Sequence, residues 1–530
     1  MHKKIILFVL ILLVEYNFAQ ETIGLVFNDV SKTKSNGYTL INPISDSRTF
    51  LINNCGEVVH QWDFSGEDAR NYYLLENGNI FQSSGLYAEI RDWDNNILWS
   101  ITYQSVLGFR IHHDIQPLPN GNFLVLVRDN YTNTEMFAAG MDTSYPNDVL
   151  VLERIVEIKP VGTNSAEIVW EWKLFDHLVQ EFDSTKPNYG IVANNPQLLD
   201  MNYEDGEGSN PIHANAIDYN ESLDQIVFSA RHLKEVFVID HSTTTAEAAS
   251  HSGGIYGKGG DFLWRWGNPE VYNQGTISDR KLGRQHDIKW ITEGPDKGKM
   301  SVFSNDGYGT NTAFSSVHII DQNATNGVYT LEADKFLPND YFWSWDGTIM
   351  GTPMLGDAQC GVQIMSNGNA LINETINGRI TEVDREGNVI WVYIIPVGNN
   401  TNYSQFTTEI SGNNAFRAHR YAENYAGFNG KTFNNTGIIE DVNSISAACS
   451  ASLSVENLYF SDLRVYPNPT KSYLNFSLQM DEIKVFDVSG KTVLSTKNSK
   501  NINLENLVKG LYFVKILSEE NSKIIKVLKN

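Results

Sequence analysis

Cysteine is scarce in this chain: the 530 residues include only Cys55, Cys360 and Cys449, and no two of them have C-x-x-C spacing. A disulfide framework and a cysteine-based metal site are thereby excluded. Proline is scarce too, at 15 residues, while 41% of the residues are hydrophobic. This composition excludes a disordered or collagen-like chain, and the length indicates more than one and fewer than four ordinary domains.

Basic residues are also few, because 40 Lys and Arg face 63 Asp and Glu, which gives a net charge of −23. A surface of this sign repels a phosphate backbone, so we expect no nucleic acid partner. Aromatic residues, by contrast, reach 12% of the chain, with 11 Trp and 24 Tyr. This abundance favours an architecture built from β-strands over a helical bundle.

Long hydrophobic runs are absent, since no segment approaches 18 apolar residues, and we therefore expect no transmembrane segment. The N-terminus has a positive region at residues 2–4, ten apolar residues at 5–14 and a small-residue cleavage site at 17–20. This order predicts a signal peptide over residues 1–20, with a buried N-terminal strand as the alternative. The mature protein is then secreted or placed on the outer cell surface.

A unit of four short strands repeats along the chain. Asn-Gly-Asn turns at 77–79, 120–122 and 367–369 each join two apolar runs, which is a strong hairpin signal. A third strand that ends in an acidic residue and a fourth that ends in Trp follow. The tryptophans that end the units are Trp62, Trp99, Trp170, Trp264, Trp343 and Trp391. We therefore predict an all-β chain with a six-bladed β-propeller over residues 21–443.

The first unit shows only its third and fourth strands, at 50–53 and 58–62, while two further strands, near 403–410 and 415–421, follow Trp391. We expect these four strands to form one blade that both chain ends share. Such closure removes the exposed edges of an open sheet.

The C-terminal residues differ from the rest, because residues 459–530 carry a net charge of +4 and leave −27 to the preceding region. A Ser/Ala-rich stretch predicts a linker over residues 444–458. Alternating short strands at 473–478, 483–488, 510–516 and 523–528 then predict a small antiparallel β-sandwich over residues 459–530.

Three segments of this tail, 465–470 (VYPNPT), 483–487 (IKVFD) and 510–514 (GLYFV), resemble the C-terminal sorting domain of type IX secretion. The resemblance implies passage through an outer membrane, with the type IX secretion machinery as a partner. An ordinary accessory β-domain is the alternative.

Polar residues recur at one position of the innermost strands, seven residues before the Asn of each turn. Arg70, His113, His213 and Cys360 occupy it, and His286 begins its own blade in the same way. Innermost strands surround the central channel, so we expect these side chains to converge on one face.

Arg231, at the end of a second strand, should return to that face. Three imidazoles and a guanidinium in an acidic protein indicate a site for a tetrahedral oxyanion such as a sulfate or phosphate ester. Structural histidines are one alternative, and a three-histidine zinc site is another. A cation such as Arg231 beside a metal is costly, so we expect no metal and no cofactor.

Segments around these residues, 211–220 (PIHANAIDYN), 229–231 (SAR), 259–269 (GGDFLWRWGNP) and 285–287 (QHD), resemble the bacterial aryl-sulfate sulfotransferases. Over roughly residues 49–428 the resemblance implies a six-bladed propeller that moves a sulfuryl group from an aryl sulfate to a phenolic acceptor. It implies that His286 is the nucleophile and is transiently sulfated. The residues that it assigns to the sulfuryl oxygens are His213, Asn215, Arg231 and the pair His112 and His113, of which the spacing prefers His113.

The chain departs from longer family members, because it has no room for their N-terminal β-domain and no cysteine between Cys55 and Cys360 for their disulfide. Asn305, after a second strand, is expected to touch the acceptor, and Arg420 to reach the same face, with a position on the protein surface as the alternative for Arg420. The glycine-rich segment 253–260 lacks a P-loop lysine and predicts a flexible loop. Two other functions stay open: a non-catalytic secreted propeller that binds glycans or proteins, and an aryl sulfate ester hydrolase.

Overall fold

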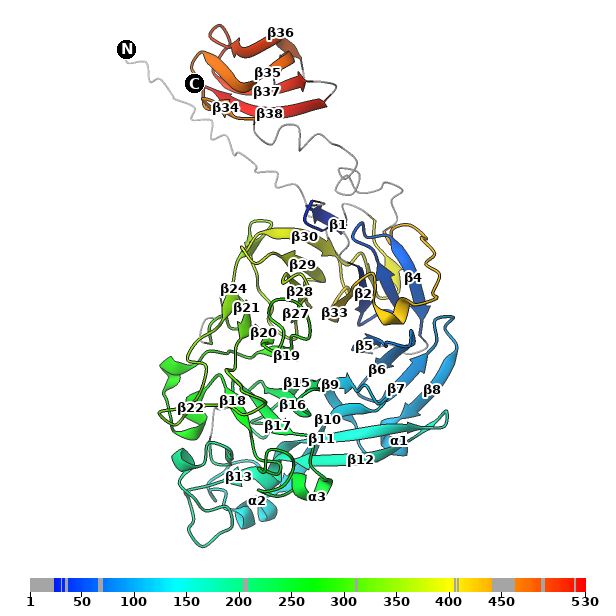
Figure 1. Ribbon diagram of the computed structural model, residues 1–530, viewed down its shortest axis with the longest axis vertical. Coiled ribbons are helices and arrows are strands. Elements are labelled where there is room, and N and C mark those ends of the chain that lie inside the picture. Colours follow the sequence, from blue (N-terminus) through cyan, green and yellow to red (C-terminus); the bar gives the residue numbers. More distant parts are fainter. Residues whose placement is uncertain are drawn as a thin grey trace, which may run out of the picture. The chain divides into compact units, whose positions relative to one another are not determined.

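The computed structural model describes residues 23–29, 31–33, 37–64, 70–203, 208–309, 313–404, 407, 409–440, 463–487, 491–518 and 521–530. The predicted signal peptide and linker lie outside these residues. The chain divides into two compact units, residues 1–448 and 449–530. Strands dominate both units (Figure 1), which confirms the all-β prediction, and no helix in the described ranges is long and apolar enough to cross a membrane.

In its described residues the first unit contains six antiparallel sheets of four or five strands each. From the inner strand outwards, the first sheet is β5 (Asn71–Leu74), β6 (Ile80–Ser83), β7 (Tyr87–Arg91) and β8 (Ile97–Thr102), and the second is β9 (Ile111–Pro117), β10 (Phe123–Thr132), β11 (Val149–Val161) and β12 (Ser165–Lys173). The third is β15 (Ala214–Asn220), β16 (Gln225–Ala230), β17 (Glu235–Asp240) and β18 (Trp264–Trp266), and the fourth is β19 (His286–Trp290), β20 (Met300–Ser304), β21 (Ser316–Ile320) and β24 (Trp343–Trp345). The fifth is β27 (Gly361–Ile364), β28 (Ala370–Glu374), β29 (Arg379–Val383), β30 (Val389–Ile394) and β1 (Gly24–Asn28), and the sixth is β33 (Ala415–Tyr421), β2 (Tyr38–Pro43), β3 (Arg48–Ile52) and β4 (Val58–Asp63).

Short elements decorate the connections between these strands. They are the helices α1 (Tyr103–Val106), α2 (Asn133–Ala139) and α3 (Thr245–Ala248), the 3-10 turns η1 (Leu174–His177), η2 (Val192–Asn194), η3 (Pro269–Tyr272), η4 (Ile277–Asp279) and η5 (Ala426–Phe428), and the strand pairs β13 (Leu178–Val179) with β14 (Leu199–Asp200), β22 (Leu331–Glu332) with β23 (Lys335–Phe336), β25 (Thr348–Ile349) with β26 (Thr352–Pro353), and β31 (Val397–Gly398) with β32 (Thr401–Asn402).

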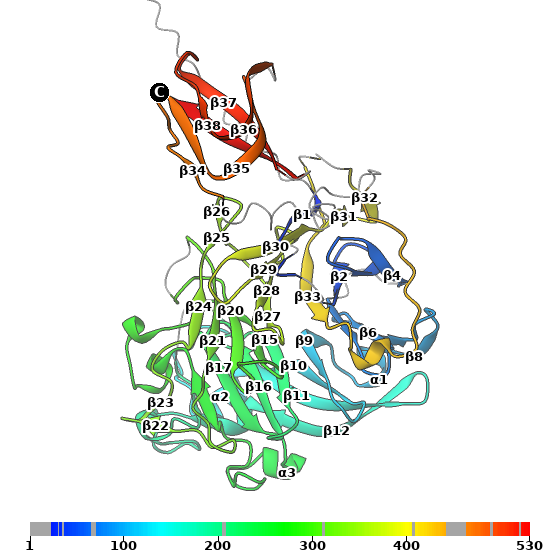
Figure 2. The ribbon, with the colours of Figure 1, turned by 45° about the horizontal axis from the view of Figure 1, so that its top comes forward.

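Hydrogen bonds between a side chain and the backbone tie each inner strand to the next. The linked pairs are Asn71 with His113, Asp114 with Ile217, Asp218 with Trp290, Asp287 with Val362, Gln363 with Arg420, and Tyr421 with Leu74, at 2.7–3.1 Å. The order is therefore β5, β9, β15, β19, β27, β33 and back to β5. The six inner strands form a closed ring around a common centre (Figures 1 and 2).

The tryptophans of the fourth strands join the same sheets further out. In each case the indole nitrogen donates to a residue at the hairpin between the third and fourth strands of the next sheet. The pairs are Trp62 with Asp92, Trp99 with Ser165, Trp170 with Thr243, Trp264 with Leu337, Trp343 with Arg385, and Trp391 with Asn54. A buried indole needs such a partner, which explains why the repeat keeps Trp at this position.

The sheet that both chain ends share takes a different number of strands from each end than the sequence predicts. Only β33 comes from the C-terminal side, whereas β2, β3 and β4 all come from the N-terminal side. The predicted strand at 403–410 is not a strand in its described residues. Five of the six residues of β2 are buried, so β2 lacks the alternation of a half-exposed strand and no Asn-Gly turn marks its end. The first of the predicted four-strand repeats therefore lacks only its inner strand, because β2, β3 and β4 supply the other three.

Where the structure describes it, the second unit is a single five-stranded sheet rather than the predicted sandwich. Its strands are β34 (Val465–Tyr466), β35 (Tyr473–Phe486), β36 (Thr492–Asn503), β37 (Gly510–Ser518) and β38 (Asn521–Lys529). β35 joins two predicted strands into one, and its pairing with β36 shifts register between Asn475 and Met480. Such an irregularity bends a strand, so one sheet can curl around its own apolar face.

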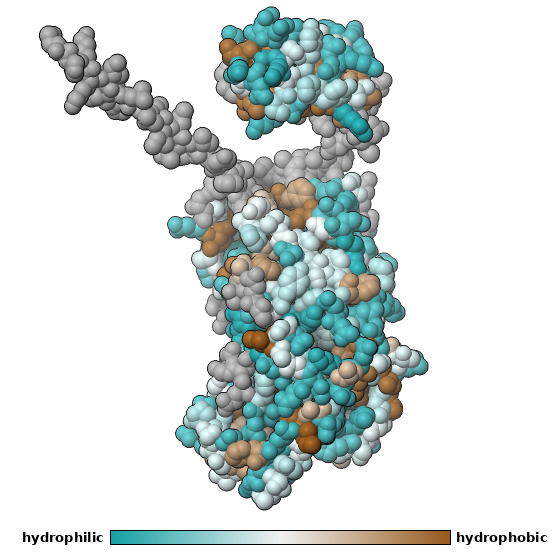
Figure 3. Space-filling view, turned by 90° about the vertical axis from the view of Figure 1, so that its left-hand side faces the viewer, coloured by the Kyte–Doolittle hydropathy of each residue, from teal (hydrophilic) through white to brown (hydrophobic). Residues whose placement is uncertain are grey.

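The surface is largely hydrophilic on the face that Figure 3 shows, as the acidic composition implies.

Two cysteines lie in the described ranges. Cys55 is disulfide-bonded, whereas Cys360 is free and buried.

Candidate active site

The predicted histidines lie where the inner strands begin, and the backbone there is unusual. His113, His213 and Cys360 have left-handed conformations, with φ of 59°, 50° and 74°, and Asp287, next to His286, has φ of 58°. Register shifts interrupt the pairing of β9, β15 and β19 with their second strands at the same places. Such bulges redirect side chains and cluster at functional sites. Here they coincide with residues whose side chains approach one another, such as His113 and His213.

Three of the predicted histidines meet there. His113 Nε2 lies 2.9 Å from His213 Nε2, and the rings of His112 and His113 are 4.2 Å apart between centroids. His213 Nδ1 lies 3.0 Å from Asn210 Nδ2 and 3.3 Å from Arg128 Nη2. Both of these neighbours are donors, so Nδ1 of His213 accepts and its proton sits on Nε2, directed at His113.

His286 begins β19 and is buried, with 2% of its surface exposed. Its Nδ1 lies 2.7 Å from Asn305 Oδ1, while Asn305 Nδ2 donates to the carbonyl oxygens of Gly356 at 2.6 Å and Gln359 at 3.2 Å. Since carbonyl oxygens only accept, the amide orientation is fixed and its oxygen must face His286. His286 therefore carries its proton on Nδ1 and its lone pair on Nε2.

The charge state of His286 follows from its surroundings. Burial lowers the pKa of His286 to about 3, and the charges of Arg417 and Arg231 act in the same direction, against the hydrogen bond to Asn305. The ring is thus neutral at physiological pH. A neutral imidazole with a fixed tautomer can act as a nucleophile through Nε2.

Arg231 follows β16, and its Nη1 donates to Nε2 of His232 at 2.6 Å. The Nδ1 of His232 in turn donates to the carbonyl oxygen of Asn210 at 2.7 Å, which holds the ring in the tautomer that accepts from Arg231. The charge of Arg231 helps to lower the pKa of both His213 and His286. Its guanidinium therefore acts on both histidines.

Two predicted binding residues have other partners. Asn215 is fully buried and donates from Nδ2 to the carbonyl oxygen of Gln285 at 2.8 Å, directly before His286. Arg420 is also buried, pairs with Glu382, donates to Thr39 at 2.9 Å and does not join the histidines.

Arg417 reaches the site in place of Arg420. Its Nε donates to Asp287 at 2.7 Å and its Nη1 to the carbonyl oxygen of Cys360 at 2.8 Å. The expectation for Arg420 fails because β33 is an inner strand, which begins at the site, and not a second strand, which would end there. Correct assignment of this strand would have pointed to Arg417.

Sequence reasoning also missed Arg128. This residue lies on β10, and its Nη2 contacts Nε2 of His112 and approaches His213. It is six residues beyond the Asn120-Gly121-Asn122 turn and lies in the middle of β10, whereas Arg231 directly follows the end of β16. The rule that found Arg231, the residue at the end of a second strand, therefore does not find Arg128.

The ligand atoms of His112, His113 and His213 lie within 4.8 Å of one another, which is close enough to hold a metal ion. Positive groups, however, surround these rings: Arg128 contacts two of them, and the charge of Arg70 acts on His112 and His113. Burial and these charges hold the pKa of His113 and His213 well below the usual histidine value. Such a cluster suits an anion better than a cation.

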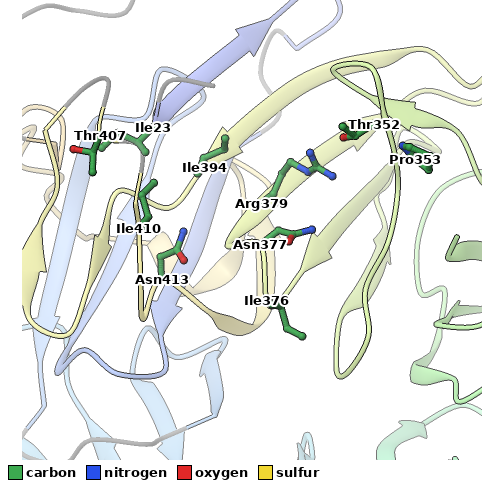
Figure 4. A pocket seen from close by; sticks show the side chains of 10 residues that line it. All are labelled: Ile23, Thr352, Pro353, Ile376, Asn377, Arg379, Ile394, Thr407, Ile410 and Asn413. Carbon is green, nitrogen blue, oxygen red and sulfur yellow. The ribbon is translucent and has the colours of Figure 1, made fainter. Parts of the chain in front are cut away.

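A cavity of about 650 Å³ opens elsewhere in the first unit (Figure 4). Its lining is mainly aliphatic and amide side chains, and its one guanidinium, that of Arg379, is paired with Glu374. The residues that line it include none of the histidines described above, so it offers no chemistry to the candidate site.

Solved structures resemble the chain only remotely. A protein of unknown function from Bacteroides caccae is 13% identical and covers 67% of this chain and 93% of its own, with a TM-score of 0.36. A catalytically inactive virginiamycin B lyase from Staphylococcus aureus with quinupristin is 11% identical and covers 72% and 86%, with a TM-score of 0.34. These scores are too low to support an argument, and no curated protein matches the chain.

Two family models match the sequence itself. The secretion system C-terminal sorting domain matches residues 464–530, which indicates export by type IX secretion to the cell surface or the medium. The model of Arylsulfotransferase (ASST) matches residues 25–421, which is the region that contains all six sheets and the histidine cluster. The chain therefore belongs to the arylsulfotransferase family and carries a type IX secretion sorting domain at its C-terminus.

Proposed function

We propose that the six sheets are the blades of a β-propeller and that the protein moves a sulfuryl group from an aryl sulfate to a phenolic acceptor through His286. The observation that carries this proposal is the fixed state of His286. Asn305 holds the proton on Nδ1, and burial keeps the ring neutral, with a pKa of about 3. The Nε2 lone pair is then available to attack sulfur at neutral pH.

In the first step Nε2 of His286 forms a bond to sulfur while the bond between sulfur and the aryl oxygen breaks. The phenolate leaves with the electron pair of that bond. The ring of the sulfo-histidine gains positive charge, and its Nδ1 proton stays directed at Asn305 Oδ1. That hydrogen bond becomes charge-assisted and therefore stronger as the bond to sulfur forms.

In the second step the oxygen of a phenol attacks sulfur, the N–S bond breaks and its electron pair returns to His286. The proton of the acceptor needs a base, and the leaving phenolate needs an acid. His113 Nε2 and His213 Nε2 lie 2.9 Å apart and share a proton, and the charge of His286 acts on His113, so we assign the transfer of this proton to these two rings. Arg231 and Arg128 supply positive charge for the sulfuryl oxygens, with His112 adjacent to Arg128.

The remaining predicted residues act in this scheme through others. Asn305 orients the nucleophile, and Asn215 fixes the backbone that precedes it.

We further propose that residues 1–20 are a signal peptide, that 444–458 link the two units and that the sorting domain at 459–530 is the contact with the type IX secretion machinery.

Transfer of the sulfuryl group from 4-nitrophenyl sulfate to phenol tests the proposed activity. We expect release of nitrophenol that depends on the acceptor, formation of phenyl sulfate, and loss of both products in the His286→Ala variant. Release of nitrophenol and inorganic sulfate without any dependence on the acceptor would instead indicate an ester hydrolase. Absence of both activities in a folded protein would favour a non-catalytic binding protein.

A further inference from the structure

A second cluster of histidines lies away from the proposed catalytic site. His177 ends η1, which follows β12, whereas His251 and Asp261 belong to the loop that joins α3 to β18. Asp261 Oδ1 lies 2.9 Å from Nδ1 of His177 and 2.7 Å from Nδ1 of His251. The ligand atoms of the three residues lie within 4.8 Å of one another.

The tautomer of His177 makes this arrangement unusual. Its Nε2 lies 2.8 Å from the carbonyl oxygen of Ala248, which can only accept, so Nε2 carries a proton. In a neutral ring Nδ1 then holds a lone pair, and this lone pair faces an acidic oxygen of Asp261. His177 is fully buried beneath Trp172, with the two rings nearly parallel. A positive species between Nδ1 and the carboxylate is needed to make this contact favourable.

A bound divalent metal satisfies these groups. Histidines that bind a metal usually donate their other ring nitrogen to a carbonyl or carboxylate oxygen, as His177 does to Ala248. Two imidazole nitrogens and one carboxylate oxygen are a donor set that Zn²⁺ accepts, with a further position for water. The alternative is an extra proton, which would create a buried imidazolium paired with Asp261.

The surrounding loop is built for close approach to His177. A Cβ atom on Gly260 would lie 2.5 Å from His177 Nε2 and 2.0 Å from the oxygen of Ala248, so only glycine fits there. The Gly260 carbonyl also accepts from Nε1 of Trp172 at 2.8 Å. The glycine-rich segment that the sequence predicts to be a flexible loop thus packs its last glycine against the histidine.

We propose that His177, His251 and Asp261 bind one Zn²⁺ ion that joins the sheet of β9–β12 to the sheet of β15–β18. In tetrahedral zinc sites the nitrogen and oxygen ligands lie about 3.3 Å apart. His177 is fixed, but the side chain of His251 is 59% exposed and can rotate to reach this spacing. The ion ties together the two sheets whose inner strands carry His113 and His213.

The test is zinc content of the purified full-length chain after treatment with a chelator, reloading with Zn²⁺ and dialysis. We expect one equivalent of zinc in the wild type and in His113→Ala. We expect zinc affinity to be weaker by more than about 10-fold in His251→Ala and in Asp261→Asn. His251 is exposed, so its replacement should leave the fold intact. Zn²⁺ should raise the melting temperature of the wild type and of His113→Ala, and not that of His251→Ala.

His113→Ala separates this cluster from the histidines of the candidate active site. Zinc that is lost in His113→Ala and retained in His251→Ala would place the ion among those histidines and overturn the proposal. A wild-type chain that retains no zinc after reloading would also overturn it, in favour of a protonated His177. Neither measurement depends on sulfotransferase activity.

Discussion

Replacement of Asn305 by alanine tests whether the tautomer of His286 matters for turnover. The substitution removes the 2.7 Å contact with Nδ1, which is the contact that becomes charge-assisted when sulfur bonds to Nε2. A hydrogen bond to a charged group contributes about 1.5–3 kcal/mol. Because about 1.4 kcal/mol corresponds to a factor of ten, kcat should fall by about 10- to 150-fold in Asn305→Ala. KM should change little, since the bond strengthens only as the ring becomes positive.

The variant also leaves two backbone carbonyls without the Asn305 amide, so it needs a control for a general loss of structure. Asn268→Ala serves this purpose, because Asn268 is fully buried and donates to the carbonyl oxygen of Leu233 at 3.0 Å without contact to the histidines. Both variants should melt at a lower temperature, but only Asn305→Ala should lose kcat. Steady-state transfer from 4-nitrophenyl sulfate to phenol measures the difference. An unchanged kcat in Asn305→Ala, or an equal loss in both variants, would refute the role of the fixed tautomer.

Three further outcomes follow from the same geometry. The pH profile of kcat/KM should show no loss from protonation of His286 between pH ~7 and ~5, since this ring gains its second proton only near its pKa of about 3. Asn305→Asp should raise the pKa of His286 and move the acidic decline of kcat/KM to higher pH. A wild-type decline near the usual histidine pKa that is caused by protonation of His286 would contradict this expectation. Arg417→Gln should reduce kcat, whereas Arg420→Gln should leave kcat unchanged and cost about 3–5 kcal/mol of stability by removing the guanidinium that pairs with the buried carboxylate of Glu382, as denaturant unfolding of both variants would show. A chain that ends at residue 447 should keep its cooperative melting transition and its activity, and loss of both would contradict the division into two units.

The parts of the fold that the sequence predicted are those with a repeated physical cause. Trp recurs in the fourth strands because each indole donates to the next sheet, and this requirement recurs six times, although Trp264 and Trp343 begin their strands rather than end them as predicted. Histidines recur at the start of inner strands because those strands form a ring, in which side chains at equivalent positions come close together. Periodic signals of this kind survive in a single sequence.

Features without a repeated signal were missed or assigned to the wrong element. β2 is buried almost throughout, so neither alternation nor a turn motif marks it, and β33 was then taken for a second strand. Because of this one misassigned strand, Arg420 was predicted to reach the site, whereas Arg417 is the residue that does so. The contact of Arg128 with His112 depends on bulges in the inner strands, whose effect on side-chain direction the sequence does not encode in a readable pattern.

The covalent intermediate is the central claim of this account, and mass spectrometry tests it most directly. The wild-type protein is mixed with 4-nitrophenyl sulfate in the absence of an acceptor, quenched and digested. The peptide that contains His286 should gain about 80 Da, the mass of one SO₃ group, and should lose it when phenol is added before the quench. His286→Ala should remain unmodified. An active wild-type enzyme whose His286 peptide stays unmodified with donor alone, or a fully active His286→Ala variant, would contradict the mechanism.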